Sequence, residues 1–211
     1  MIKAILFDLD GTLLDTHDLI LESMQHAVKE VLRKEIPPEH LMAKVGQPLT
    51  TQMWDFTQSQ ELHDELLRVY RAYNAVKHDG MVRPFDGVED TLQTLVDQGF
   101  PVGVVTSKRH EAAMQGLRLF GLERFLSCMI GADDWPEHKP DPGPVVHGAQ
   151  LLGLGADACM YVGDSPYDIQ AGNSAGCTTA AALWGMFSEA TLVAERPDFT
   201  CIGIRDVPCL L

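Results

Sequence analysis

The sequence predicts an α/β fold, namely a doubly wound (Rossmann-like) parallel sheet with a helical cap domain inserted after the first strand. Short runs rich in Ile, Val and Leu recur along the chain without alternating polar residues, which is typical of strands buried on both faces of a parallel sheet. Longer segments with helical spacing of apolar residues separate these runs. Strand and helix in alternation favour a sheet covered by helices on both faces.

The strands expected from these runs are, in chain order, residues 4–9, 101–106, 125–131, 158–164 and 177–183. The helix expected after the second domain boundary covers residues 88–99. There Val88, Leu92 and Leu95 form one apolar stripe, and Gly99 suits the helix C-terminus.

The stretch from about Thr16 to Asp79 breaks this alternation. It contains no strand-like run, but residues 19–32 and 61–76 have helical spacing. Such a length is too great for an ordinary connection between a strand and a helix. We therefore expect a core domain of residues 1–15 and 83–211 and a cap domain of residues 16–82, with hinges at residues 14–17 and 79–84.

Composition excludes several classes of partner. The formal net charge of -14 and the isoelectric point near 4.8 argue against nucleic acid and anionic lipid, which require clustered Lys and Arg. The N-terminus lacks the pattern of a signal peptide, and no apolar run reaches the ~18 residues of a membrane helix. The five cysteines have no paired spacing and suit buried thiols in a reducing compartment. We expect a cytoplasmic protein, monomeric or homodimeric, with no nucleic-acid or membrane partner.

Polar residues follow the strands at the edge where a parallel sheet binds its ligands. The first strand ends in Asp8 and Asp10, and the second in Thr106 and Ser107. Lys139 follows the third strand in HKPDP. The fourth is followed by GDSPYD, which carries Asp164 and Asp168. These side chains are expected to converge.

Four carboxylates in one pocket repel one another unless cations accompany them. A divalent metal and Lys139 would remove this repulsion, and the all-oxygen donor set favours Mg²⁺. The expected ligands are the carboxylates of Asp8 and Asp164 and the backbone carbonyl of Asp10. Asp168 would act directly or through water.

A carboxylate beside Mg²⁺ is able to attack a phosphorus atom, so Asp8 is the expected nucleophile and an aspartyl-phosphate the expected intermediate. Asp10 would be the general acid and then the general base. Gly11 would let the backbone approach the phosphoryl group, and Thr12 would orient the Asp10 carboxyl.

Three further groups are expected to bind the phosphoryl oxygens. Thr106 would supply a hydroxyl, Ser107 an amide and Lys139 a positive charge. On the cap, the VGQP turn at residues 45–48 would face the site, with Lys44, Arg71 and Lys77 as candidate anion contacts. Lys108 and Arg109 are interpreted as the solvated start of a helix.

These residues resemble the four ordered motifs of the haloacid dehalogenase superfamily, in its phosphatase branch. The motifs are DLDGT at residues 8–12, Thr106 after VGVV, Lys139 in KPDP, and GDSPYD at residues 163–168. The resemblance implies Mg²⁺, an aspartyl-phosphate and a helical cap. It extends to the phosphoglycolate phosphatases and the bacterial inorganic pyrophosphatase of this branch, and the segments YRAYNAVKHD, VEDTLQTL and VTSKR are similar to the latter.

The favoured function is a phosphatase that acts on a small phosphorylated metabolite, as the phosphoglycolate phosphatases do. Alternatives are an inorganic pyrophosphatase and a phosphosugar mutase resembling β-phosphoglucomutase, which would return the phosphoryl group to its substrate. A phosphoacceptor signalling domain is a further alternative of another class. It would carry its phosphorylated aspartate at the end of the third strand, where FLSCMIG has no carboxylate.

Overall fold

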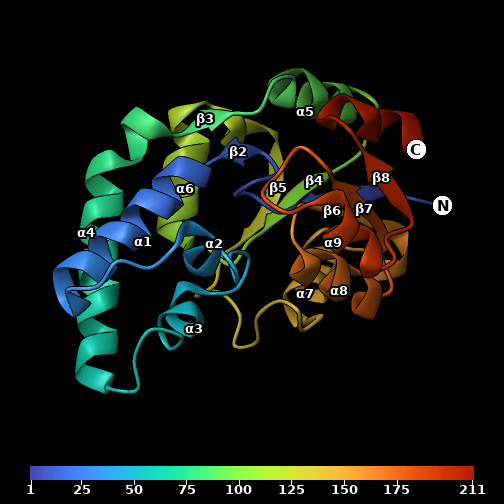
Figure 1. Ribbon diagram of the computed structural model, residues 1–211. Helices are drawn as coiled ribbons and strands as arrows, with labels where there is room; N and C mark the ends of the chain where they lie inside the picture. The colour runs from blue at the N-terminus through green and yellow to red at the C-terminus, as the bar shows by residue number, and fades with distance from the viewer.

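The computed structural model describes residues 1–211, and its centre is a six-stranded sheet in the order β5-β4-β1-β6-β7-β8 (Figure 1). Every neighbouring pair of strands in this sheet is parallel. The α/β fold class is therefore confirmed, and each expected strand is present. The strands are β1 (Ala4–Phe7), β4 (Val102–Val105), β5 (Leu126–Ile130), β6 (Cys159–Gly163), β7 (Thr178–Ala182) and β8 (Phe199–Cys201).

Both faces of the sheet are buried, and the first strand shows why its sequence is apolar throughout. Ile5 and Phe7 pack into one hydrophobic cluster, whereas Ala4 and Leu6 pack into a second cluster on the opposite face. Successive side chains of a strand point to opposite faces, so a strand covered on both sides needs apolar residues at every position.

Helices cover these two faces. On the face of the larger cluster lie α5 (Val88–Asp97), α6 (His110–Leu119) and the 3₁₀ segments η1 (Leu122–Phe125) and η3 (Ile204–Leu210). The other face is covered by α7 (Gly143–Leu151) and α8 (Pro166–Ala175). The remaining elements of this part are η2 (Ala156–Ala158) and α9 (Glu189–Ala194).

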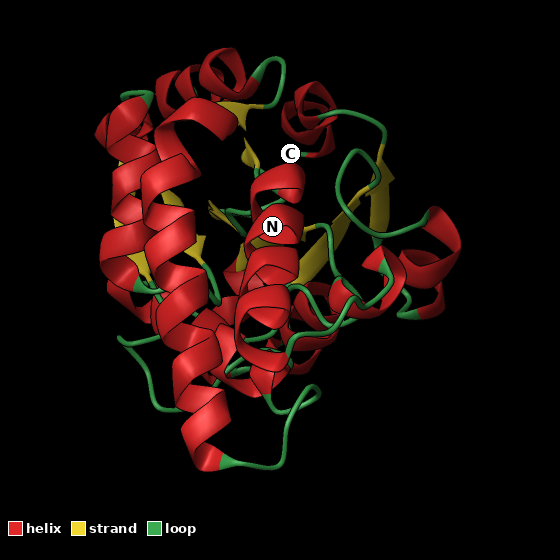
Figure 2. Ribbon diagram, turned by 60° about the vertical axis from the view of Figure 1, so that its left-hand side comes forward, coloured by secondary structure: helices red, strands yellow, loops and turns green.

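The chain between residues 17 and 81 forms a separate group of helices, called the cap helices below (Figures 1 and 2). The longest pair packs lengthwise, and Met24 and Val28 of the first helix share a hydrophobic cluster with Leu66 and Tyr70 of the second. This cluster is distinct from those on the sheet. The cap helices are α1 (His17–Leu32), α2 (Pro38–Leu41), α3 (Leu49–Met53) and α4 (Gln60–Met81).

The connections to the cap helices contain a feature that the sequence analysis did not predict. Two short strands, β2 (Leu14–Asp15) and β3 (Arg83–Pro84), pair antiparallel, with Leu14 opposite Pro84. Helix α4 continues to Met81, so the first residues of the second expected hinge, 79–81, are helical. The third unpredicted strand, β8, lies at one edge of the main sheet.

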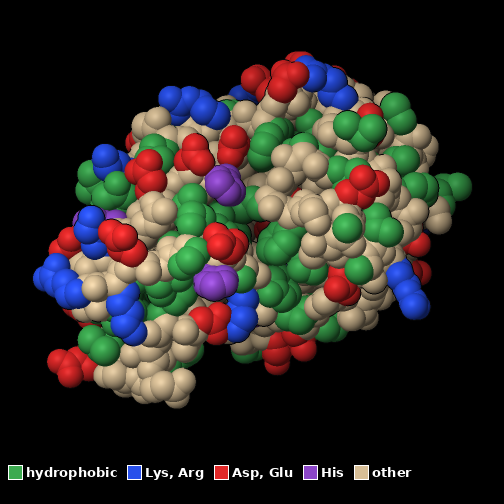
Figure 3. Space-filling model, viewed as in Figure 1, with side chains coloured by type: hydrophobic (Ala, Val, Ile, Leu, Met, Phe, Trp, Pro, Cys, Tyr) green, Lys and Arg blue, Asp and Glu red, His purple; other side chains and the backbone are tan.

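The cysteine thiols are all free, and no helix has the combination of length and apolar character that crossing a membrane requires. Charged and histidine side chains are visible on the surface where the cap helices meet the rest of the molecule (Figure 3). The cavity described below lies between these two parts.

Candidate active site

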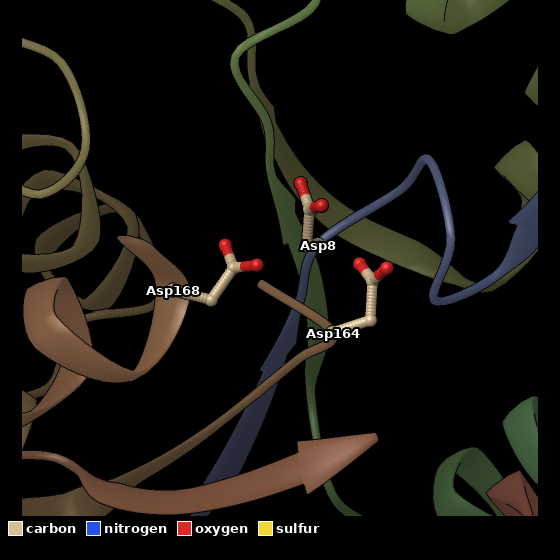
Figure 4. Close-up of side chains that lie close together, drawn as sticks. All are labelled: Asp8, Asp164 and Asp168. Carbon is tan, nitrogen blue, oxygen red and sulfur yellow. The ribbon is translucent and has the colours of Figure 1, made fainter. Parts of the chain in front are cut away.

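The structure brings three predicted aspartates together at the carboxyl ends of β1 and β6. Asp8 follows β1, Asp164 follows β6, and Asp168 lies in the first turn of α8. One carboxylate oxygen from each lies within 4.8 Å of the others, and all three residues are buried. Figure 4 shows the carboxyl groups gathered around a common centre. The convergence expected from the strand ends is therefore present for these residues.

The Asp164 carboxylate is fixed from two directions. It accepts hydrogen bonds from the Thr12 hydroxyl at 3.2 Å and from the Met186 amide at 2.7 Å. Gly11 has a φ of +86°, and a Cβ at this position would overlap the Asp164 carboxyl group. The turn after β1 therefore requires glycine both for its backbone and for the space that Asp164 occupies. The expectation that Thr12 orients Asp10 is corrected, since its hydroxyl bonds Asp164.

Lys139 lies between two of the carboxylates and is itself buried. Its ammonium is 2.8 Å from Asp8 Oδ1 and 2.5 Å from Asp168 Oδ1. The second oxygen of Asp168 accepts bonds from the Ser165 amide at 3.0 Å and the Ser165 hydroxyl at 2.6 Å. Protein donors thus occupy both oxygens of Asp168, which holds Lys139 against Asp8.

Ser165 is a site residue that the sequence analysis missed. It is the N-cap of α8, and its hydroxyl and the Asp168 carboxylate exchange hydrogen bonds with each other's backbone amides as a capping box. The signal was present in the sequence as Ser165 followed three positions later by an acidic residue. The hydrogen bonds that cap α8 therefore also position the Asp168 carboxylate, which holds Lys139.

Burial and mutual repulsion govern the ionisation of this cluster. Burial raises the pKa of Asp8 to about 7, Lys139 opposes this rise and Asp168 adds to it. The pKa of Asp164 is raised well above its usual range by burial and then by Asp168 and Asp8. Burial acts to lower the pKa of Lys139, but Asp168 and Asp8 outweigh it and raise that pKa. The cluster contains three carboxyl groups and one ammonium. Its charge, when these groups are ionised, is therefore negative and favours the binding of a further cation.

The donor set of the cluster identifies the kind of ion that it would hold. Asp8 and Asp164 offer carboxylate oxygens at the end of adjacent strands, and neither histidine nor cysteine is among the clustered groups. Oxygen donors of this kind match hard divalent cations such as Mg²⁺. The residues present therefore fit a magnesium ion.

Asp10 stands apart from the buried cluster and is partly accessible. Its carboxylate lies 3.0 Å from the ammonium of Lys108, whose side chain is only 13 % exposed. The interpretation of Lys108 as a solvated helix start is therefore wrong. No periodicity in the sequence could indicate this contact, because it joins residues on two different strand-to-helix connections.

The second strand contributes Thr106 and Ser107, but these two residues have different surroundings. Thr106 is buried, and its hydroxyl accepts a hydrogen bond from the Lys108 amide at 3.3 Å. The hydroxyl of Ser107 donates to the Gly46 carbonyl on the cap at 2.6 Å. Ser107 therefore links the core to the VGQP turn, which the sequence analysis expected to face the site.

Gly46 is held closely against the core. Its φ is +100°, and a Cβ at this position would lie 2.7 Å from Ser165 Oγ and 3.1 Å from the Tyr167 ring. Only glycine combines this backbone conformation with so close an approach. The turn on the cap is thus seated directly over the loop that carries Asp164 and Asp168.

Between the cap helices and the strand ends lies a cavity of about 990 Å³. Asp8, Asp10, Thr106 and Ser107 line it from the core. Of the candidate anion contacts on the cap, one lines the cavity and two do not. The cavity-lining residue is Arg71, whereas Lys44 pairs with Asp55 at 2.6 Å and Lys77 lies over the Tyr73 ring.

Known proteins resemble this chain in sequence and in structure. A family model described as haloacid dehalogenase-like hydrolase matches residues 5–182. The pyrophosphatase PpaX of Anoxybacillus flavithermus is 37% identical over 100% of this chain and 97% of its own. The pyrophosphatase PpaX of Bacillus pumilus is 36% identical over 98% of this chain and 94% of its own. A crystal structure described as a predicted phosphoglycolate phosphatase from Haemophilus somnus superposes with a TM-score of 0.89 at 26% identity, covering 99% of this chain and 97% of that one.

Proposed function

Because the chain belongs to the haloacid dehalogenase-like hydrolases and is a phosphate-hydrolysing enzyme of that family, we propose that it acts through an aspartyl-phosphate formed on Asp8. The observation that carries the proposal is the placement of Asp8. Its carboxylate is fixed by Lys139, clustered with Asp164, and exposed on one side to the cavity that also contains Asp10.

Mg²⁺ would be held by the carboxylates of Asp8 and Asp164 and the backbone carbonyl of Asp10, and when bound it supplies positive charge that polarises the phosphoryl group. We assign Asp168 a different role from a direct ligand. Both of its oxygens already accept protein hydrogen bonds, so it would keep Lys139 charged and in place beside Asp8.

In the first step, a carboxylate oxygen of Asp8 would attack phosphorus, and the bond from phosphorus to the leaving oxygen would break. Asp10 would give its proton to that oxygen. In the second step, Asp10 would take a proton from water while the water oxygen attacks phosphorus, which releases phosphate and restores Asp8. Thr106, the Ser107 amide, Gly11 and Lys139 would support the phosphoryl oxygens.

Residues 16–82 would act as a cap that excludes water from the cavity, with residues 1–15 and 83–211 as the catalytic core. The bond from Ser107 to Gly46 and the fit of Gly46 against Ser165 support this division of roles. All the residues to which we assign catalytic roles belong to this chain, and we propose that the protein acts as a monomer or a homodimer. We place the protein in the cytoplasm because its thiols are free and mostly buried.

Pyrophosphate is the substrate that we propose first. The relatives that match at 36–37% identity over nearly the whole chain are pyrophosphatases. Phosphoglycolate is the second candidate, supported by the structural likeness at 26% identity. Phosphosugar mutase activity would differ from both because no phosphate would be released.

The test uses purified protein with Mg²⁺ and p-nitrophenyl phosphate, pyrophosphate, phosphoglycolate and hexose phosphates, comparing kcat/KM. Asp8→Asn should abolish turnover, and Asp10→Ala should slow it and allow a phosphoenzyme to be trapped. Asp18→Asn changes an exposed aspartate on α1 and is the matched control. An Asp8→Asn variant with most of its activity would disprove the mechanism.

A further inference from the structure

The cationic side chains of the cavity are not all alike in their surroundings. Most of them are paired with carboxylates that line the same cavity, and one is not. The pairs are Lys108 with Asp10 at 3.0 Å, Arg109 with Asp133 at 3.3 Å, and Arg118 with Glu111 at 3.8 Å. Arg71 takes part in none of the ion pairs or side-chain hydrogen bonds of the molecule, although the protein carries a net charge of -14.

Arg71 reaches the cavity because of its position on α4. Tyr70, Arg71, Asn74, Ala75 and His78 recur at the spacing of one helical face, and all of them line the cavity. Asp10 is close enough to Tyr70 to raise the pKa of that phenol, after the larger effect of burial. The helical turn that carries Arg71 therefore lies opposite the catalytic edge of the core.

Arg71 also lies near a second guanidinium across the cavity. Partial desolvation beside the cavity lowers the pKa of Arg71, although the residue is exposed overall; Arg109 lowers that pKa further, and Asp133 opposes both effects. Arg71 comes from the cap and Arg109 from the start of α6 in the core, so the two charges repel each other across the boundary between cap and core. An anion between them would remove this repulsion.

We propose that Arg71 binds a second anionic group of the substrate, on the part that leaves, with Arg109 facing the same group. This inference rests on the proposed function and narrows its substrate class to small compounds that carry a phosphoryl group and a second phosphate or carboxylate. A guanidinium forms paired hydrogen bonds with either group, so the shared chemistry is a planar or tetrahedral oxyanion. Uncharged leaving groups would leave Arg71 without a partner.

The test compares Arg71→Gln, Arg71→Lys and a matched control, Arg68→Gln. Arg68 lies on the same helix but pairs with Glu65 and does not line the cavity. The substrates are pyrophosphate, phosphoglycolate and p-nitrophenyl phosphate, of which only the last lacks a second anionic group. Arg71→Gln should raise KM by about tenfold or more for a substrate with the second group. Hydrolysis of p-nitrophenyl phosphate should change by less than about twofold, since no charged contact is lost.

The substrate whose KM rises in Arg71→Gln identifies the second anionic group that Arg71 recognises. A rise with pyrophosphate indicates a phosphate, a rise with phosphoglycolate indicates a carboxylate, and a rise with both indicates that either is bound. Arg71→Lys should retain part of the affinity, since it keeps the charge and loses the paired geometry. An equal loss for all three substrates, or no loss for any, would overturn the proposal. Arg68→Gln should leave every value unchanged.

A binding measurement separates this proposal from the proposed function. Isothermal titration with Mg²⁺ would compare methylenediphosphonate and 3-phosphonopropionate, which carry a second anionic group, with methylphosphonate, which does not. Arg71→Gln should weaken the binding of methylenediphosphonate, of 3-phosphonopropionate or of both, and should leave the binding of methylphosphonate unchanged. This result is expected even if no substrate is turned over. If the wild-type protein binds neither of the first two more tightly than methylphosphonate, the assignment of Arg71 is wrong.

Discussion

Replacement of Lys139 by methionine would remove the single ammonium from the buried acidic cluster while keeping a side chain of similar length. The structure places this ammonium 2.8 Å from Asp8 and 2.5 Å from Asp168, and all three groups are buried. Removing one partner of a buried ion pair costs about 3–5 kcal/mol because the other charge is left without compensation. We expect a loss of this size in the free energy of unfolding when a chelator is present.

The loss should depend on pH in a defined direction. Lys139 lowers the pKa of Asp8, which is about 7 in the folded protein, so its removal raises that pKa further. Consider a pH between the pKa of Asp8 in the folded wild type and the higher pKa of Asp8 in the folded variant. At that pH the folded variant keeps a proton on Asp8 that the folded wild type has released. The variant then binds more protons when folded than when unfolded, and its stability falls as pH rises. The difference from wild type should therefore widen above about pH 7.

The assay is chemical denaturation followed by circular dichroism at one pH below 7 and one above it. Lys44→Met is the matched control, because Lys44 also pairs with an aspartate, at 2.6 Å, but in a half-exposed position. An exposed pair contributes much less to stability than a buried one, because water screens its charges. If Lys139→Met costs no more than Lys44→Met at either pH, the electrostatic account of the site is refuted.

Three further changes test other parts of the structure. Gly46→Ala should lower kcat/KM by about tenfold or more, because its Cβ would meet Ser165 and separate the cap from the core, and should also destabilise the fold by about 1 kcal/mol or more, because its φ of +100° is strained for alanine; steady-state kinetics measure the first effect, and unchanged kinetics would contradict it. Leu66→Ala should cost about 2–5 kcal/mol in thermal or chemical unfolding because its side chain is fully buried among the cap helices, whereas Leu62→Ala, at an exposed position, should cost far less. Mg²⁺ should raise the melting temperature more at about pH 8 than at about pH 5, because a proton on Asp8 competes with the ion below its pKa of about 7; a shift independent of pH would count against metal binding at Asp8.

The sequence was sufficient to predict the sheet and the residues that end its strands. Buried parallel strands need apolar residues throughout, and this makes them visible in the sequence even when they are short. For the same reason an aspartate at the end of such a strand, such as Asp8 or Asp164, is conspicuous. The strands that escaped prediction have two or three residues each, too few for a pattern to show.

The contacts among the site residues were harder to predict than their presence. Thr12 bonds Asp164 rather than Asp10, although Asp10 is much nearer in the sequence. Lys108 is directed into the cavity toward Asp10 rather than into solvent. Each outcome depends on the direction in which a side chain leaves its turn, and residue type and spacing leave that direction open.

The pairing of β2 with β3 has a consequence for how such a protein could change over evolution. Leu14 and Pro84 lie side by side, so the chain leaves the core and returns to it at almost the same point. A segment with adjacent ends is replaceable by a longer or shorter one at a modest entropic cost, since closing a loop depends only weakly on its length. The cap helices could therefore be exchanged as a module, which would change substrate selectivity while the catalytic residues of the core keep their geometry.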